Sequence, residues 1–126
     1  MISGIGTDII EVSRIKDRIS NDPALKRYLF TRNEIRYCDS KITWSEAYAG
    51  RFAAKEAFLK ALGTGLAEKM RYRDIEITLD PLGKPGICVS GYIKEYCDHL
   101  AIDSIFVSIS HVKELAIAMV VIQTKA

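Results

Sequence analysis

The chain has 126 residues, 48% of them apolar and 27% charged, which predicts a single domain, residues 1–126, with its own core. A net charge of +2 is too small to argue for nucleic acid, and no apolar run is long enough to span a membrane. The first residues show no basic region followed by a long apolar run, so we expect no signal peptide. Three widely spaced cysteines without a Cys-x-x-Cys motif indicate reduced thiols in a cytoplasmic protein.

Residues 2–10 alternate in the manner of a β-strand. Gly4, Gly6 and Asp8 point to the same face of this strand, and the two glycines leave space around the carboxylate. Glycine inside a strand often marks the close approach of a ligand or of another backbone. Two interpretations of Asp8 stay open here: a functional carboxylate, or a turn or cap residue at the end of the strand.

Residues 11–21 predict a short helix with an apolar stripe. Arg14 and Arg18 lie one turn apart beside that stripe, and Lys26 and Arg27 follow. This basic group either meets an acidic partner or only solvates the surface.

The next two predicted helices have clear end signals. Thr31 and Glu34 have the spacing of a capping box, which predicts a helix over residues 31–38. A longer helix starts near Thr43, and Gly63 is its expected C-cap.

Glu56 lies on the edge of the apolar side of this long helix, with Lys60 one turn further on. A carboxylate beside a packed face needs a partner, because burying an unpaired charge is costly. Either Glu56 and Lys60 form a weak surface pair, or Glu56 has a functional role.

The second half of the chain predicts a hairpin, a helix and a further hairpin. Residues 75–79 alternate like a half-buried strand, and the turn that follows contains Gly83, Lys84 and Pro85. A short helix is expected over residues 91–100, with Tyr92, Ile93, Tyr96 and Leu100 facing inward.

Two final strands complete the predicted elements. Residues 105–110 alternate, whereas Leu115–Ile122 is almost wholly apolar and predicts a central strand buried on both faces. His111 ends the first of these strands, where functional side chains often sit on a rigid support; it is either such a side chain or an ordinary polar loop residue. The order of elements predicts an α+β fold with a largely antiparallel sheet packed against a long central helix.

Four stretches of the sequence form one recognisable pattern when they are taken together. They are Gly4 to Ile15, Arg51 to Gly65 (with Arg-Phe-Ala-Ala-Lys-Glu at its start), Gly83-Lys84-Pro85, and Val107 to His111. In this order and at these intervals they resemble the short type of 4′-phosphopantetheinyl transferase, the holo-[acyl-carrier-protein] synthases. The resemblance covers essentially the whole chain.

The resemblance implies a 4′-phosphopantetheinyl transferase-like fold and a reaction. Such enzymes transfer the 4′-phosphopantetheine group of coenzyme A to a serine of apo acyl carrier protein, in fatty acid biosynthesis, and release adenosine 3′,5′-bisphosphate. They require Mg²⁺, and the short type resembles a homotrimer with active sites at subunit interfaces. Mg²⁺ usually takes one or two carboxylates together with substrate phosphates and waters, a demand that Asp8 and Glu56 fit.

The resemblance also implies roles for other residues. Lys60 would contact phosphate as a point charge, Arg51 a coenzyme A phosphate, and His111 a phosphate oxygen. Lys55 would serve phosphate or structure, and Gly83, Lys84 and Pro85 would border the nucleotide end. The basic residues Arg14, Arg18, Lys26 and Arg27 would dock the acidic carrier protein, most clearly at Arg14. The general base stays open between Glu56 and a water on the metal.

Three other functions are alternatives to this one. The first keeps this chemistry but acts on a carrier domain of a polyketide or peptide synthase, although the short chain favours the fatty-acid carrier. The second is a non-catalytic trimeric module that binds coenzyme A or the carrier. The third, a nucleic-acid binder, lacks an aromatic and basic surface motif; we expect neither nucleic acid nor a membrane as a partner.

Overall fold

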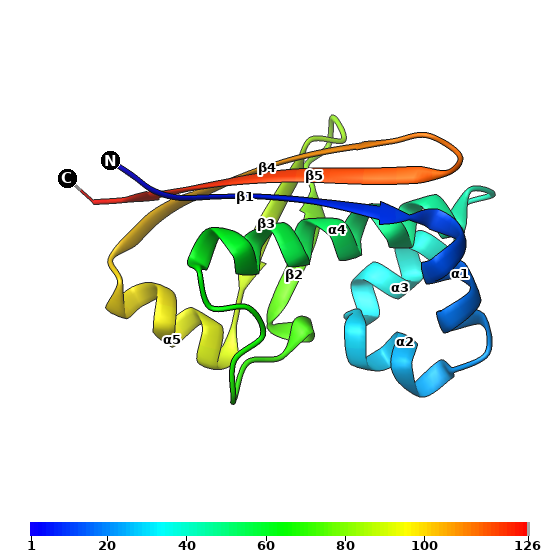
Figure 1. The fold of residues 1–126 in the computed structure, drawn as a ribbon, viewed down its shortest axis with the longest axis horizontal. Coiled ribbons are helices and arrows are strands. Elements are labelled where there is room, and N and C mark those ends of the chain that lie inside the picture. Colours follow the sequence, from blue (N-terminus) through cyan, green and yellow to red (C-terminus); the bar gives the residue numbers. More distant parts are fainter. Residues whose placement is uncertain (126) are drawn as a thin grey trace.

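The computed structural model describes residues 1–125. Figure 1 shows the elements in chain order. They are β1 (Ile2–Glu11), α1 (Val12–Ser20), α2 (Pro23–Leu29), α3 (Arg32–Asp39), α4 (Trp44–Leu62), the 3₁₀ helix η1 (Tyr72–Asp74), β2 (Ile75–Leu79), β3 (Pro85–Val89), α5 (Gly91–His99), β4 (Ile102–His111) and β5 (Leu115–Thr124).

The strands form two antiparallel sheets. One has the order β1-β5-β4, and the other is the β2-β3 hairpin. Helix α4 runs along one face of the three-stranded sheet, with α1 to α3 near its start and α5 near its end (Figure 1). The predicted α+β fold, with an antiparallel sheet packed against a long central helix, is confirmed.

Both predicted helix-end signals are present in the structure. Thr31 accepts a hydrogen bond from the backbone of Glu34, and the Glu34 side chain accepts one from the backbone of Thr31, which is the expected capping box. Gly63 ends α4 with a φ of 80°, a left-handed conformation that costs glycine little. Within residues 1–125, no helix combines the length and apolar character needed to cross a membrane.

The glycines of β1 allow this strand to lie directly against α4. A Cβ atom on Gly4 would stand 2.1 Å from the carbonyl oxygen of Ala61, and one on Gly6 would stand 2.0 Å from that of Ala57. The close approach predicted from these glycines is therefore made by the backbone of α4. It brings the inward face of β1, which carries Asp8, onto the same helix as Glu56 and Lys60.

The prediction that β5 is buried on both faces is wrong for the single chain. Every second residue from Ala116 to Ile122 is buried, but Leu115, Ile117 and Met119 on the opposite face are 39–46% exposed. The reason is that α4 covers only one face of the sheet (Figure 1). Because almost every residue of β5 is apolar, the sequence does not show the alternation of buried and exposed side chains that the structure has.

The inward face of α5 also differs from the prediction. Ile93 and Cys97, one turn apart, are buried, and Tyr96 is half-buried. Tyr92 and Leu100 are 37% and 40% exposed. The helix is too short to bury a wider stripe: it ends at His99, and its packed face is a single i, i+4 pair.

Candidate active site

Asp8 lies on the inward face of β1 and contacts α4 through Lys60. The Oδ1 atom of Asp8 accepts a hydrogen bond of 2.9 Å from Lys60 Nζ, which also donates to the carbonyl of Thr7 at 3.0 Å. The other oxygen, Oδ2, is buried and has no hydrogen-bond partner within residues 1–125. A buried carboxylate oxygen without a partner is costly, and a bound cation would satisfy it.

Glu56 is held by a tyrosine rather than by the neighbouring lysine. The hydroxyl of Tyr72 donates to Oε1 of Glu56 at 2.5 Å. The alternative surface pair between Glu56 and Lys60 is wrong, because Lys60 pairs with Asp8 instead. Burial first, and then the hydrogen bond and charge of Glu56, raise the pKa of Tyr72 above its usual value.

The two carboxylates fit a magnesium site in number and chemistry. No group of three or more His, Cys, Asp or Glu side chains within the described part of the chain has the arrangement of a metal centre. Mg²⁺, however, is commonly held by one or two carboxylates and completes its shell with phosphates and water. Asp8, with its orphaned buried oxygen, and Glu56 meet that requirement.

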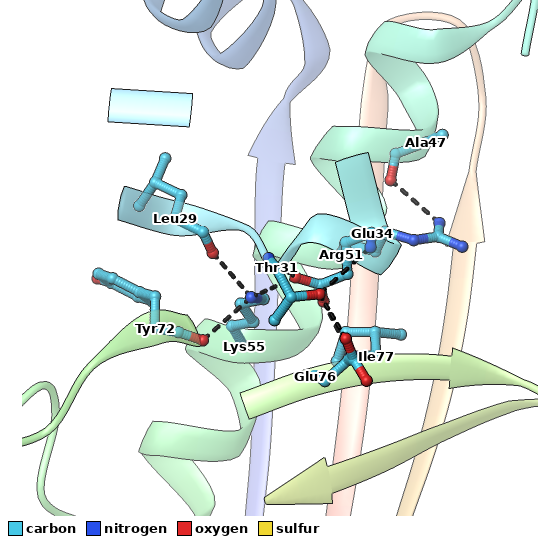
Figure 2. A network of polar contacts seen from close by, with 9 residues as sticks. All are labelled: Leu29, Thr31, Glu34, Ala47, Arg51, Lys55, Tyr72, Glu76 and Ile77. Carbon is cyan, nitrogen blue, oxygen red and sulfur yellow. Dashed lines mark hydrogen bonds and ion pairs between the residues drawn. The ribbon is translucent and has the colours of Figure 1, made fainter. Parts of the chain in front are cut away.

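Lys55 has a structural environment. It is wholly buried and donates to Oε1 of Glu34 at 2.7 Å and to the carbonyls of Leu29 at 2.7 Å and Tyr72 at 3.0 Å (Figure 2). Burial lowers the pKa of Lys55 from its usual value, and the charge of Glu34 opposes this shift. Of the two roles considered for Lys55, phosphate or structure, these contacts favour structure.

A second group of predicted residues lines a hollow of about 340 Å³ beside the first half of α4. Arg51, Gly83, Pro85 and His111 all border it, whereas Lys84 does not. Lys84 takes part in the hairpin turn, where its backbone N–H donates to Asp80 at 2.8 Å. The structure thus gathers most of the residues that were predicted to bind coenzyme A in one place.

Two residues of this hollow were missed by the sequence analysis. Oε1 of Glu46, in the first turn of α4, lies 2.9 Å from Nδ1 of His111. The Arg51 guanidinium lies 4.3 Å from the ring centre of Tyr37 and donates to the carbonyl of Ala47. The Nε atom of Arg51 is buried without a hydrogen-bond partner in the described chain. The signal for Glu46, an acidic residue in a first helical turn, is too common to single it out.

The two groups lie apart within one chain. Arg51 and Lys60 are nine residues apart on α4, which is about 13 Å along the helix axis. Asp8 lies opposite Ala118 of β5, and Ala118 lies opposite Ile109 of β4. The strand that carries His111 is therefore about 10 Å across the sheet from Asp8. Within the single chain, the predicted catalytic residues therefore fall into two groups.

Three of the four predicted docking residues are exposed, and the fourth forms an ion pair within the chain. Arg14 and Arg18 are exposed on α1 and border a separate hollow of about 320 Å³ with Phe52. Arg27 is exposed on α2. Lys26 is instead engaged within the chain, since its Nζ lies 3.0 Å from Asp39.

Comparison with known proteins defines the class. Residues 4–120 match the family model of the 4′-phosphopantetheinyl transferase superfamily, and the chain belongs to this superfamily. Within it, the chain is 48% identical over 120 residues to the holo-[acyl-carrier-protein] synthase of Ruminiclostridium cellulolyticum, covering 94% of this chain and 90% of that protein. The predicted family is thereby confirmed.

Solved structures of holo-[acyl-carrier-protein] synthases also resemble this chain. The crystal structure of the holo-[acyl-carrier-protein] synthase from Neisseria meningitidis matches with a TM-score of 0.90 and 33% identity, over 98% of this chain and 100% of that one. The Helicobacter pylori synthase in complex with coenzyme A matches with a TM-score of 0.83 and 36% identity, over 94% and 99%.

Proposed function

We propose that the chain transfers the 4′-phosphopantetheine group of coenzyme A to a serine of apo acyl carrier protein. The serine oxygen gives up its proton to a general base and forms a bond to the phosphorus that carries pantetheine. The bond from that phosphorus to the oxygen of the leaving phosphate breaks. The products are holo acyl carrier protein and adenosine 3′,5′-bisphosphate. The observation that carries the proposal is the pair Asp8 and Glu56 beside Lys60, in a chain that matches the superfamily from residue 4 to residue 120.

Each group of residues has a task in this transfer. Asp8 and Glu56 would hold Mg²⁺, which supplies positive charge to the pyrophosphate. Lys60 adds a point charge next to Asp8. Arg51, His111 and the turn at Gly83 and Pro85 would bind the nucleotide end, with Glu46 orienting the His111 ring. Positioning and charge stabilisation supply most of the catalysis in phosphoryl transfer.

Intact-mass spectrometry tests the proposed reaction. Apo acyl carrier protein incubated with this protein, coenzyme A and Mg²⁺ should gain the mass of one phosphopantetheine, and EDTA should abolish the gain. A carrier domain from a polyketide or peptide synthase should react more slowly; a faster reaction would move the partner to that class. No gain on any carrier that a known transferase modifies would overturn the proposal in favour of a binding module.

A homotrimer is the second part of the proposal. The sheet face away from α4 carries exposed apolar side chains on all three strands, among them Ile5, Ile9, Phe106, Ile117 and Met119. Contiguous exposed apolar patches of this kind usually mark an interface. A neighbouring copy on this face would cover it.

Met119→Arg should dissociate the trimer. A charge at the centre of an apolar interface is left buried and unpaired, so sedimentation equilibrium should report the mass of one chain, and transfer activity should fall with it. Leu100→Arg is a matched control, because Leu100 is similarly exposed at the end of α5 but away from this face. A wild-type protein that already sediments as a single chain would refute the trimer.

Arg14→Glu should weaken the binding of the carrier protein rather than the binding of coenzyme A. Arg14 is exposed on α1, acyl carrier proteins are strongly acidic, and interface charges mainly govern encounter and register. We expect KM for the carrier to rise about tenfold with KM for coenzyme A nearly unchanged. Lys16→Glu makes the same charge change on the same helix outside the hollow and should have a smaller effect. A loss of coenzyme A affinity in Arg14→Glu would count against docking at this position.

The compartment and the domain organisation belong to the same proposal. Cys38, Cys88 and Cys97 are free thiols, which supports a reducing compartment, and we place the protein in the cytoplasm. The superfamily match and the full-length similarity to relatives support residues 1–126 as one domain.

A further inference from the structure

Tyr72 links the buried network of the protein to the proposed metal site. It lies in η1, directly before β2. Its backbone carbonyl accepts a hydrogen bond of 3.0 Å from Lys55, and its hydroxyl donates to Oε1 of Glu56. Lys55 and Glu56 are consecutive residues of α4, so both ends of Tyr72 are fastened to the same helix turn.

The ring of Tyr72 is held as firmly as its backbone. It packs with its centre 5.6 Å from that of Phe52 and 5.8 Å from that of Tyr28, the latter edge-on. Lys55 is in turn fixed by Glu34 and by the carbonyl of Leu29 (Figure 2). A hydroxyl held in this way presents its donor in one direction.

The hydrogen bonds to Asp8 and Glu56 determine which carboxylate oxygens are available to a cation. Lys60 occupies Oδ1 of Asp8, and Tyr72 occupies Oε1 of Glu56. Oδ2 of Asp8 is the buried oxygen that lacks a partner, and Oε2 of Glu56 accepts no hydrogen bond from the described residues. Each carboxylate therefore has one oxygen committed to the protein and one oxygen available.

We infer that Tyr72 is a positioning residue for Glu56: its hydroxyl occupies one carboxylate oxygen and turns the other toward the cation shared with Asp8. Groups that hydrogen-bond to metal-binding carboxylates orient them and strengthen the site. The inference rests on the proposed function, since it takes Glu56 as a magnesium ligand. It adds a residue outside the sequence motifs, whose side chain would act on the cation only through Glu56.

Tyr72→Phe isolates the hydroxyl, because phenylalanine keeps the ring packing. We expect the dissociation constant for Mn²⁺, measured from the electron paramagnetic resonance signal of the free ion with coenzyme A present, to rise about tenfold. The Mg²⁺ concentration that half-activates transfer should rise equally, while kcat at saturating Mg²⁺ and the Tm of the metal-free protein stay nearly unchanged. This split separates positioning from a merely structural role.

Tyr28→Phe is the matched control. It removes a hydroxyl from the ring that packs on Tyr72, and that hydroxyl makes no hydrogen bond within residues 1–125, so Mn²⁺ affinity should not change. If wild type and Tyr72→Phe bind Mn²⁺ equally and need the same Mg²⁺ concentration, the inference is overturned and the proposed function stands. If the wild-type protein transfers phosphopantetheine in EDTA, the magnesium assignment and this inference fall together.

Discussion

Replacing Asp8 by Asn or Glu56 by Gln should slow phosphopantetheine transfer by about 10²–10³-fold, the range typical of losing one preorganised charge-stabilising group. Each substitution keeps the size of the side chain and removes one negative charge from the proposed cation site. In the wild-type chain one oxygen of Asp8 is buried without a partner. Asp8→Asn turns this carboxylate into a neutral amide. Initial rates from intact-mass time courses over a range of Mg²⁺ concentrations measure the effect.

Glu95→Gln is the control for this experiment, because Glu95 is exposed on α5, and it should retain the wild-type rate. Higher Mg²⁺ should restore part of the lost rate in the Asp8 and Glu56 variants, since weaker binding is offset by mass action. A variant that transfers at the wild-type rate would exclude its carboxylate from the metal site, although the reaction itself would stand.

Lys55→Met should lower the free energy of unfolding by about 3–5 kcal/mol, the usual cost of removing one member of a buried ion pair. The side chains of Lys55 and Glu34 are both 0% exposed, so Glu34 would be left as a buried charge. The carbonyls of Leu29 and Tyr72 would also lose their donor. Denaturant unfolding at a fixed protein concentration measures the change.

The double variant Lys55→Met/Glu34→Gln sharpens the test. Glutamine carries no charge, and its single oxygen can keep one of the two backbone hydrogen bonds that Oε1 and Oε2 of Glu34 accept from Thr31 and Ile77. Losing the other bond costs less than leaving an unpaired buried charge. The double variant should therefore be more stable than Lys55→Met alone. Lys94→Met removes a lysine whose ion pair with Asp98 is exposed and should leave the free energy of unfolding nearly unchanged. If the two substitutions in the buried pair act additively, the charge of Glu34 is not what destabilises the single variant.

Most of the fold was predictable because its signals are local. The capping box at Thr31, the C-cap at Gly63 and the turn formers after β2 each act over a few residues, and the structure confirms all three. The burial of β5 was not predictable in the same way. When both faces of a strand are apolar, the sequence does not reveal whether the second face meets the same chain or another one.

The site was predicted as a set of residues rather than as an arrangement. Asp8, Glu56 and Lys60 were singled out, but the pairing of Lys60 with Asp8 depends on how β1 crosses α4, over a separation of 52 residues. The contact between His111 and Glu46 spans 65 residues. Tyr72 belongs to no motif, and only tertiary packing shows its hydroxyl at Glu56. Long-range contacts of this kind leave no periodic trace in the sequence.

The direct contact of β1 with α4 also limits how the site can change over evolution or in the laboratory. At Gly4 and Gly6, even a methyl group would collide with a carbonyl oxygen of α4. The gap between strand and helix is thus fixed by main-chain atoms, and exchanging core side chains elsewhere does not adjust it. A library randomised at these two positions should yield mainly glycine among active clones. Enlarging the proposed cation site would have to begin by moving the helix.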